Sequence, residues 1–217
     1  MLKLHGFSHS GNTFKVAFLL RALGVPWQPV AMSFADFAAG ATRSPAWREG
    51  INEMGEVPVL EDDSGRLTTQ SGVILTMLAE QHGGFGGADD DERREVLRWL
   101  LYDNHKFTSY FATWRFMKSF AAKAPDPAVA AFLKSRIDSA FFVVDKHLSA
   151  RDYMDGNALT IADMSLSGYL FFPADESGCV LEERFPHLAA WRERLRAAPG
   201  WGDPYEILPG ERIAPRW

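Results

Sequence analysis

The first eighty residues alternate short apolar runs with amphipathic stretches. Residues 2–7 (LKLHGF) alternate weakly between apolar and polar positions, a pattern that favours a short strand. Apolar residues then follow helical spacing from Thr13 to Leu23, and Gly24 lies where a helix C-terminus is expected. Strands are also predicted at 27–32 and on both sides of a Ser-Gly turn, followed by a helix with an apolar stripe of Val73, Ile74, Met77 and Leu78. Between the second strand and the Ser-Gly turn, residues 33–55 hold irregular helical pieces and several breakers. The resulting order, β-α-β-α-β-β-α, indicates a small α/β layer.

The second part of the chain has a different pattern. Residues 83–92 (GGFGGADDDE) hold four glycines in five positions, which indicates a flexible connection, and their acidic run suits a helix N-terminus. No Lys-Ser/Thr pair follows, so a phosphate-binding glycine loop is disfavoured. Amphipathic helices are expected at 92–120, 127–148, 160–172 and 186–197. We therefore predict an α/β domain at 1–83, a linker at 84–88 and an all-helical domain at 89–217.

One helix start in the helical part is well specified. Thr160 can cap the helix and Asp163 can reach back three residues to complete a capping box, with Leu159 and Met164 as a hydrophobic staple. Losing such a cap costs about 1 kcal/mol. We interpret this feature as a folding signal without a catalytic role.

Composition narrows the class of protein. The 217 residues are 47% hydrophobic, enough for a folded core, and the formal net charge of −5 argues against a nucleic-acid surface. The single cysteine, Cys179, cannot form an internal disulfide, and no apolar run approaches the roughly 20 residues of a membrane span. The N-terminus lacks a secretory pattern, so we expect a cytoplasmic protein. His5 and His9 straddle a strand and a loop, so we expect no metal site.

The stretch SHSGN, at 8–12, joins the first strand to the first helix. Ser10 or Asn12 can serve as the N-cap of that helix, which is the structural interpretation. The functional interpretation uses the same geometry, because a helix N-terminus presents free N–H groups and a partial positive charge to an anion. A serine hydroxyl there can donate a hydrogen bond to a thiolate or a carboxylate.

Two further stretches of the same domain suit a ligand. Pro58 stands at the start of a predicted strand, and a cis Val57–Pro58 bond would leave the Val57 backbone exposed for an extended peptide; about 5–6% of X–Pro bonds are cis. Ser71 lies at another strand-to-helix junction beside Gln70, where it can cap the helix or bind a carboxylate. A short acidic peptide with a thiol would use all three stretches.

With these stretches in view, nearly the whole chain resembles the cytosolic glutathione S-transferases, in particular the serine-type, bacterial-like members. NEMGEVPVLED resembles the family's N-P-x-G-x-V-P-V-L segment with Glu53 in place of a proline. LTTQSGVILTMLAEQHG resembles its (E/Q)-S-x-x-I-x-x-Y-L segment, and LTIADMSLSGYL its capping-box helix. The resemblance implies a thioredoxin-like N-terminal domain, an all-helical C-terminal domain and a cis bond before Pro58.

The resemblance also implies roles for individual residues in binding glutathione as co-substrate. Val57 would pair with its cysteine, Gln70 and Ser71 would hold its γ-glutamyl end, and Glu56 stands where the family often has Gln. Phe7 lacks the hydroxyl of tyrosine-using members, and counting back from Lys15-Val16 makes Ser10 the best match to the catalytic serine. Asn12 takes the place of a cysteine, and Ser8 or His9 are alternative donors.

The same resemblance implies a second substrate, a pocket for it and a partner subunit. Glutathione would be conjugated to a small hydrophobic electrophile in detoxification, in a pocket to which the aromatic-rich stretch after Arg98 contributes Phe107, Tyr110 and Trp114. Asp103 is a candidate for the glutamyl ammonium group across a homodimer, with a solvated position on the helix face as the equally favoured alternative. The alternatives are isomerase, dehalogenase or peroxidase activity on the same thiolate, or a non-catalytic member that binds glutathione or a protein. We expect no nucleic-acid or membrane partner.

Overall fold

The computed structural model describes residues 1–156 and 158–217 and divides them into two compact units. The first unit holds residues 1–84 together with 198–212, and the second holds 85–197 together with 213–217. The break after Gly84 falls in the expected glycine-rich linker. The division differs from the expected one at the other end, because the segment 198–212, which the sequence assigned to the helical domain, packs with the N-terminal unit.

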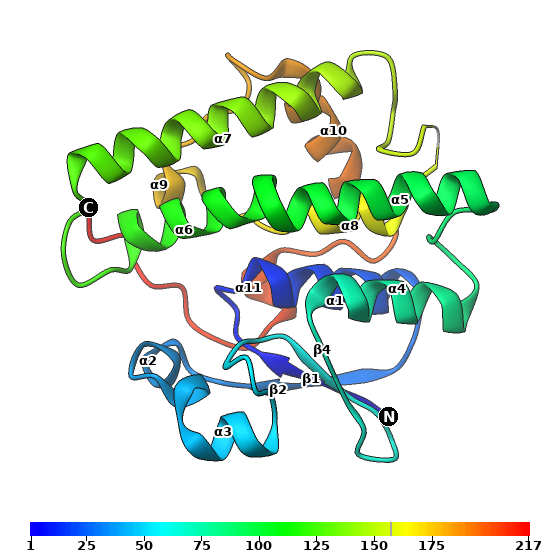
Figure 1. Cartoon of the computed structure of the whole chain (residues 1–217), viewed down its shortest axis with the longest axis vertical. Helices are drawn as coiled ribbons and strands as arrows, with labels where there is room; N and C mark the ends of the chain where they lie inside the picture. The colour runs from blue at the N-terminus through cyan, green and yellow to red at the C-terminus, as the bar shows by residue number, and fades with distance from the viewer. Residues whose placement is uncertain (157) are drawn as a thin grey trace. The chain divides into compact units, whose positions relative to one another are not determined.

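The described residues of the first unit form one four-stranded sheet in the order β2-β1-β3-β4 (Figure 1). The strands are β1 (Leu2–Gly6), β2 (Trp27–Ala31), β3 (Val59–Glu61) and β4 (Leu67–Thr69). β1 is parallel to β2 and antiparallel to β3, which is antiparallel to β4. The helices are α1 (Gly11–Ala22), α2 (Phe34–Ala38), the 3₁₀ turn η1 (Ala41–Arg43), α3 (Pro45–Gly50), α4 (Ser71–His82) and α11 (Pro204–Ile207). The predicted thioredoxin-like order is confirmed.

Helix α1 is buried on nearly all sides. Its apolar residues Phe14, Val16, Leu19 and Leu20 are fully buried, and α1 packs against α4. The predicted stripe on α4 is wrong at Val73, which is 56% exposed, whereas Leu75 is buried with Ile74 and Leu78. Val73 and Leu75 lie on different sides of the helix, and only contact with α1 decides which side is covered.

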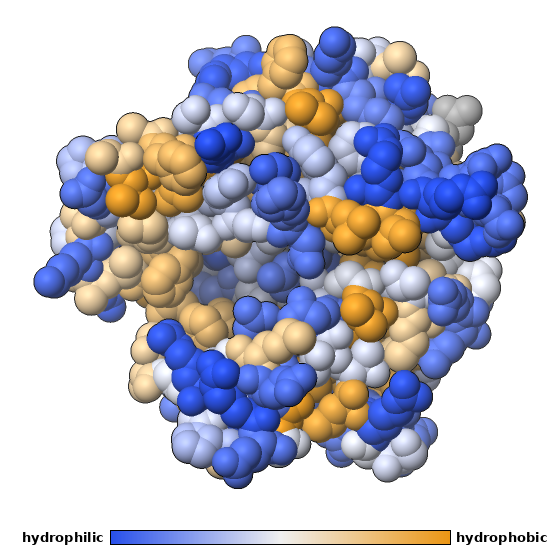
Figure 2. Space-filling view, viewed as in Figure 1, coloured by the Kyte–Doolittle hydropathy of each residue, from blue (hydrophilic) through white to orange (hydrophobic). Residues whose placement is uncertain are grey.

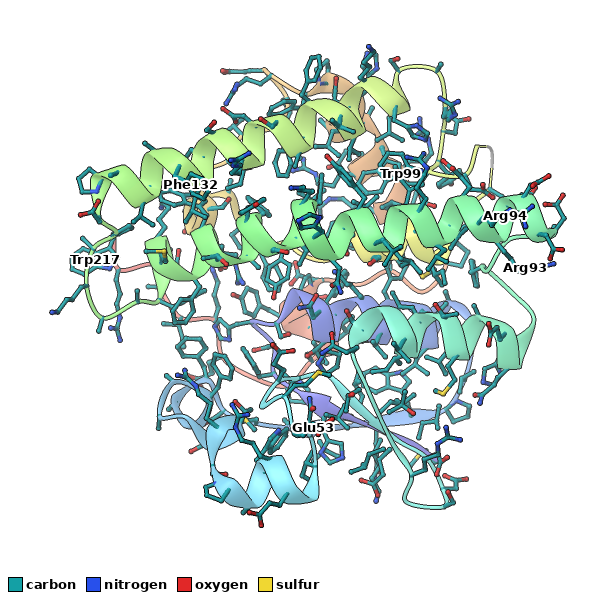
Figure 3. The ribbon with its side chains drawn as sticks, in the orientation of Figure 1. Glu53, Arg93, Arg94, Trp99, Phe132 and Trp217 are labelled. Carbon is teal, nitrogen blue, oxygen red and sulfur yellow. The ribbon has the colours of Figure 1, made fainter. Side chains whose placement is uncertain are left out.

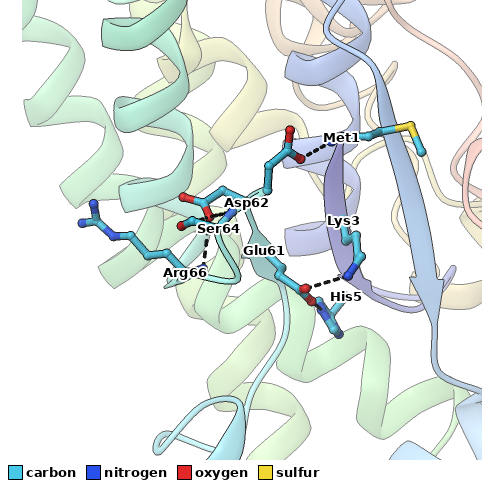
Figure 4. A network of polar contacts seen from close by, with 8 residues as sticks. Met1, Lys3, His5, Glu61, Asp62, Ser64 and Arg66 are labelled. Atoms are coloured by element: carbon cyan, nitrogen blue, oxygen red, sulfur yellow. Dashed lines mark hydrogen bonds and ion pairs between the residues drawn. The ribbon is translucent and has the colours of Figure 1, made fainter.

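Polar contacts join the two central strands of the sheet and close the turn that follows β3 (Figure 4). Glu61 of β3 accepts hydrogen bonds from Lys3 at 2.6 Å and from His5 at 2.9 Å, both on β1. The bond from Lys3, followed by the bond from His5, lowers the pKa of the Glu61 carboxyl. Asp62 closes the turn to β4 by accepting from the backbone N–H groups of Ser64 and Arg66.

The second unit is helical throughout its described elements, and the predicted all-helical C-terminal domain is confirmed (Figure 1). Its helices are α5 (Asp90–Tyr102), the π-helical turn η2 (Asp103–Phe107), α6 (Thr108–Ser119), α7 (Pro127–Leu148), α8 (Ile161–Ser167), α9 (Ala174–Ser177) and α10 (Pro186–Arg196). Two predicted helices are corrected: η2 interrupts the one at 92–120, and the one at 160–172 ends at Ser167. In the described part of the chain, no helix is long and apolar enough to cross a membrane.

The predicted capping box at the start of α8 is present. Asp163 is fully buried, and its Oδ2 accepts from the Thr160 backbone N–H at 2.9 Å. Its Oδ1 accepts from the Met154 N–H at 2.8 Å and from Trp191 Nε1 at 2.9 Å. Asp163 therefore ties the start of α8 to the preceding loop and to α10.

Candidate functional site

The register of the sheet places three junctions at one end of it. His5 of β1 pairs with Val59 of β3, and Val59 pairs with Thr69 of β4. The end of β1, the beginning of β3 and the end of β4 are therefore neighbours. The residues beyond these points are the turn 7–12, the Val57–Pro58 bond and the Gln70–Ser71 junction. The three stretches that the sequence singled out thus belong to the same end of the sheet.

Ser10 is the N-cap of α1, as the structural interpretation of the SHSGN stretch predicted. Its Oγ accepts a hydrogen bond from the Thr13 N–H at 3.1 Å, and its own N–H donates to Phe7 O at 3.0 Å. A hydroxyl that accepts one bond keeps its O–H to donate, so capping and donation to a ligand are compatible. The first turn of α1 holds no acidic residue, so no carboxylate offsets the positive end of its dipole.

Asn12 lies in the first turn of the same helix. Its side-chain oxygen Oδ1 is buried and has no hydrogen-bond partner within the described residues. A buried polar atom without a partner costs about 1–3 kcal/mol. Asn12 therefore offers an unsatisfied acceptor close in sequence to Ser10.

Ser8 and His9 form the buried part of the turn. Ser8 Oγ lies 3.3 Å from His9 Nδ1, and both residues are less than 5% exposed. The His9 ring lies 5.0 Å from the Phe34 ring of α2 and 5.1 Å from the Tyr205 ring of α11. The sequence analysis missed the contribution of α11, because nothing in the pattern of residues 198–212 ties this segment to the first strand.

The loop before β3 contains the predicted cis peptide bond between Val57 and Pro58, which is confirmed. Asn52 holds this loop: its Nδ2 donates to Glu56 O at 2.9 Å, and its Oδ1 accepts from the Met54 N–H at 3.1 Å. Glu53, labelled in Figure 3, stands where the resemblance predicts a proline. Its carbonyl oxygen accepts a hydrogen bond from Arg48 Nη1 at 2.8 Å. Asn52 is a second residue that the sequence analysis missed, although an asparagine three residues before a glycine, here Gly55, is typical of a turn.

Gln70 and Ser71 form the start of α4. The predicted cap by Ser71 is wrong: Ser71 is the first residue of the helix, and Gln70 is the N-cap without a side-chain capping bond. Gln70 has a φ of 67°, which is uncommon for a residue other than glycine. Its Nε2 donates to Glu56 Oε2 at 3.2 Å, so two of the predicted glutathione-binding residues are in contact.

Asp103 has partners within the helical unit. Its carboxylate accepts hydrogen bonds from Thr108 Oγ1 at 2.5 Å and from Ser165 Oγ at 2.6 Å, and the side chain is buried. These bonds join η2 to α8, and the burial of the side chain shows that the alternative prediction of a solvated position is wrong. Its predicted role with an ammonium group stays a prediction.

The three predicted pocket residues have different surroundings. Phe107 is buried, with its ring 4.8 Å from that of Phe141, whereas Tyr110 is half-buried beside Phe132. Trp114 lines a cavity of about 340 Å³ within the helical unit, with Lys134 Nζ 4.8 Å from its ring centre. Phe111, Ile137 and Phe185 complete the apolar wall, and Asp138, Cys179 and Arg184 are among the polar residues that line the rest.

Among the described residues, no group of three or more His, Cys, Asp or Glu side chains could hold a metal ion. His5 is bonded to Glu61, whereas His9 packs between aromatic rings. The two histidines therefore do not converge.

The fold agrees with comparisons to known proteins. A family model described as the glutathione S-transferase N-terminal domain matches residues 4–86, and one for the C-terminal domain matches residues 105–199. A glutathione S-transferase from Pseudomonas putida is 30% identical over 166 residues, which are 76% of this chain and 71% of that protein. The chain therefore belongs to the glutathione S-transferase family.

Particular relatives support this assignment. Glutathione S-transferase F14 from Arabidopsis thaliana is 26% identical over 92% of this chain and 81% of its own length. The crystal structure of a glutathione S-transferase from Pseudomonas fluorescens is 30% identical with a TM-score of 0.83, covering 94% of this chain and 98% of that one. One from Xanthobacter autotrophicus is 31% identical with a TM-score of 0.84, covering 96% and 100%.

Proposed function

We propose that the protein binds glutathione at the end of the sheet where β1, β3 and β4 meet, and conjugates its thiolate to a small hydrophobic electrophile. The observation that carries this proposal is the register His5–Val59–Thr69. It gathers the N-terminus of α1, the Val57 backbone and the N-terminus of α4 at one place. Ure2p, whose fold is similar, has been solved in complex with glutathione.

Ser10 is the proposed activating residue. Its O–H would donate to the glutathione sulfur and favour the thiolate, aided by the N-terminus of α1. Lowering a thiol pKa from about 8.5 to about 6.5 needs roughly 2.7 kcal/mol. A charge-assisted hydrogen bond contributes about 1.5–3 kcal/mol, and the helix dipole adds about 0.3–1 kcal/mol, so no general base is required.

Asn12 is the second residue that we propose for the glutathione site at the N-terminus of α1. Its buried Oδ1 lacks a partner among the described residues, and a donor on glutathione would satisfy it. The other end of the amide carries two N–H donors. Asn12 would therefore position the cysteinyl part of glutathione, while Ser10 acts on the charge of its sulfur.

The remaining glutathione contacts follow from the other two junctions. The Val57 backbone, held beside Pro58, would pair with the cysteinyl backbone, and Gln70 and Ser71 would hold the γ-glutamyl carboxylate at the start of α4. Glu56, already bonded to Gln70, would meet the ammonium group. Asp103 is not needed for this arrangement.

The electrophile and the oligomer are also proposals. Trp114 and Tyr110 remain candidates for the electrophile pocket, whereas the burial of Phe107 favours a core role. A homodimer is supported by apolar side chains that α5 and α7 leave exposed, including Leu97, Leu101 and Phe132. Phe132 is labelled in Figure 3, and Figure 2 shows hydrophobic residues at the surface of the same face. The single cysteine of the chain fits the cytoplasm as the proposed compartment.

The test combines binding and turnover. Wild-type protein should be retained on immobilised glutathione, lower the thiol pKa of bound glutathione and conjugate an activated aryl halide. Ser10→Ala should return that pKa towards about 8.5, whereas Ser44→Ala, which removes the cap of α3 in the same unit, should not. Full turnover and an unchanged thiol pKa in Ser10→Ala would remove Ser10 from this role.

The same measurements separate the alternatives. Retention without conjugation, but with turnover of a peroxide, a haloalkane or an isomerisable substrate, would identify another reaction of the same thiolate. Retention without any turnover, or binding of a protein alone, would identify a non-catalytic member.

A further inference from the structure

The segment 198–212 is fastened to the first unit along α1. Arg21 Nε on α1 donates to Gly200 O at 2.9 Å. Gly200 lies so close to the backbone of Ala22 that an added Cβ would overlap it. Farther along, Asp203 caps the short helix α11 through the Tyr205 N–H at 2.9 Å, and α11 packs against α1. The segment therefore follows α1 towards its N-terminus.

At that end the segment touches the turn that carries Ser10. The Tyr205 ring meets the His9 ring edge to face, with 5.1 Å between their centres. Gly210 lies directly against Ser8, and a Cβ added at Gly210 would overlap Ser8 Oγ. Ser8 and His9 are buried, and both immediately precede Ser10 in the chain. The turn is thus held from outside by residues nearly two hundred positions later.

We propose that residues 203–210 are a positioning element of the sulfur site, acting on Ser10 through Tyr205 and Gly210. This inference rests on the function proposed above. Ser10 cannot move independently of the turn, because its N–H is bonded to Phe7 O and its Oγ to the Thr13 N–H. A shift of Ser8 or His9 would therefore re-aim the Ser10 hydroxyl at the start of α1.

Of the two contacts, that of Gly210 with Ser8 leaves the least room for substitution. The Gly210 φ of 146° is one that side chains rarely adopt, and the space beyond its Cα is taken by Ser8. An alanine there would push the segment away or turn the Ser8 hydroxyl from His9 Nδ1, 3.3 Å distant. Both outcomes disturb the turn without removing any group from the proposed glutathione contacts.

The experiment measures the thiol pKa of glutathione bound to the full chain, by the ultraviolet absorbance of the thiolate, and the pH profile of kcat/KM. Gly210→Ala and Tyr205→Ala should raise the thiol pKa of bound glutathione, and should raise by a similar amount the apparent pKa in the pH profile of kcat/KM. They should also lower kcat/KM about tenfold at low pH, less than the roughly 100-fold loss that a 1 Å misplacement can cause. The loss should lie in kcat more than in KM.

Matched variants separate positioning from general damage. Tyr205→Phe keeps the ring against His9 and should retain the wild-type profile. Gly65→Ala, at a φ of 82° with nothing near its Cα, imposes a similar backbone strain away from the turn and should leave the profile unchanged. Thermal unfolding of each variant checks that it is folded.

A double-mutant cycle tests the route through Ser8. If Gly210 acts by contact with the Ser8 hydroxyl, Gly210→Ala should shift the thiol pKa less in a Ser8→Ala background. Folded Gly210→Ala and Tyr205→Ala proteins with the wild-type thiol pKa and profile would overturn the inference and leave the proposed function intact. An ordinary thiol pKa in the wild-type complex would instead overturn the proposed function itself.

Discussion

Thr13 of α1 occupies the space in which a side chain at Gly6 of β1 would lie. A Cβ added at Gly6 would overlap the Oγ1 and Cγ2 atoms of Thr13, which is fully buried. The strand and the helix can approach this closely only because Gly6 lacks a side chain. The turn between them, which carries Ser8 and Ser10, depends on that approach.

Gly6→Ala should destabilise the protein by about 1–3 kcal/mol, the usual cost of overpacking a core. Chemical denaturation would measure the change. Thr13→Ala removes the two overlapping atoms, so adding it to Gly6→Ala should recover part of the loss. Equal instability of the single and double variants would show that the two residues do not compete for this space.

The stability should depend on pH through Asp163. Burial raises the pKa of this carboxyl to about 6, although its hydrogen bonds act in the opposite direction. Because the folded protein binds this proton more tightly than the unfolded chain, whose Asp pKa is about 3.9, the contribution is greatest below pH ~4 and is lost as the pH rises through ~6. Urea unfolding between these pH values should show that loss in wild type relative to Asp163→Asn. A constant difference between the two proteins would contradict it.

Cys179 should be a slow nucleophile. Burial raises the pKa of its thiol to about 11, so only about one thiol in a thousand is ionised at pH 8. Alkylation by iodoacetamide should therefore be about two orders of magnitude slower than for an ordinary thiol of pKa about 8.5, and should accelerate with rising pH. The protein unfolded in urea is the control. Rapid alkylation of the folded protein at pH 7 would refute this prediction.

The ion pair between Arg115 on α6 and Glu176 on α9 is buried. Arg115 Nε donates to Glu176 Oε2 at 2.8 Å, and its guanidinium carbon lies 3.7 Å from the Phe172 ring centre. Arg115→Met should cost about 3–5 kcal/mol, because it leaves a buried carboxylate without its partner. Arg184→Met, which breaks the exposed pair with Asp138, should cost about 1 kcal/mol or less. Similar losses in the two variants would show that burial does not set the strength of these pairs.

Local patterns were enough for much of the fold. The Ser10 cap of α1 and the capping box at Thr160 and Asp163 depend on only a few neighbouring residues, and both are present. The cis bond before Pro58 was predicted from the family resemblance, because few X–Pro bonds are cis and the residue types alone do not indicate one. The roles proposed for Ser10 and Asn12 stay predictions, since glutathione itself must show them.

Long-range packing decided the rest. Whether Val73 or Leu75 is buried depends on where α1 lies, and the spacing of residues within α4 does not contain that information. The contacts of Tyr205 with His9 and of Gly210 with Ser8 join residues nearly two hundred positions apart. No periodicity in the chain could have revealed them.

The π-helical turn at Asp103–Phe107 changes the angular phase of the long helix that runs from α5 into α6. The Thr108 N–H bonds to Asp103 O, five residues earlier, so one surplus residue is absorbed there. Successive residues of an α-helix are rotated by about 100°, since 3.6 residues make a turn. Every side chain after Phe107 is therefore rotated by roughly that angle from the side on which an uninterrupted helix would display it. Trp114 and Arg115 reach Ser177 and Glu176 of α9 from this rotated setting. A one-residue deletion within the turn would restore a regular α-helix and leave both side chains directed at α9, whereas a deletion between Thr108 and Trp114 would turn both of them away.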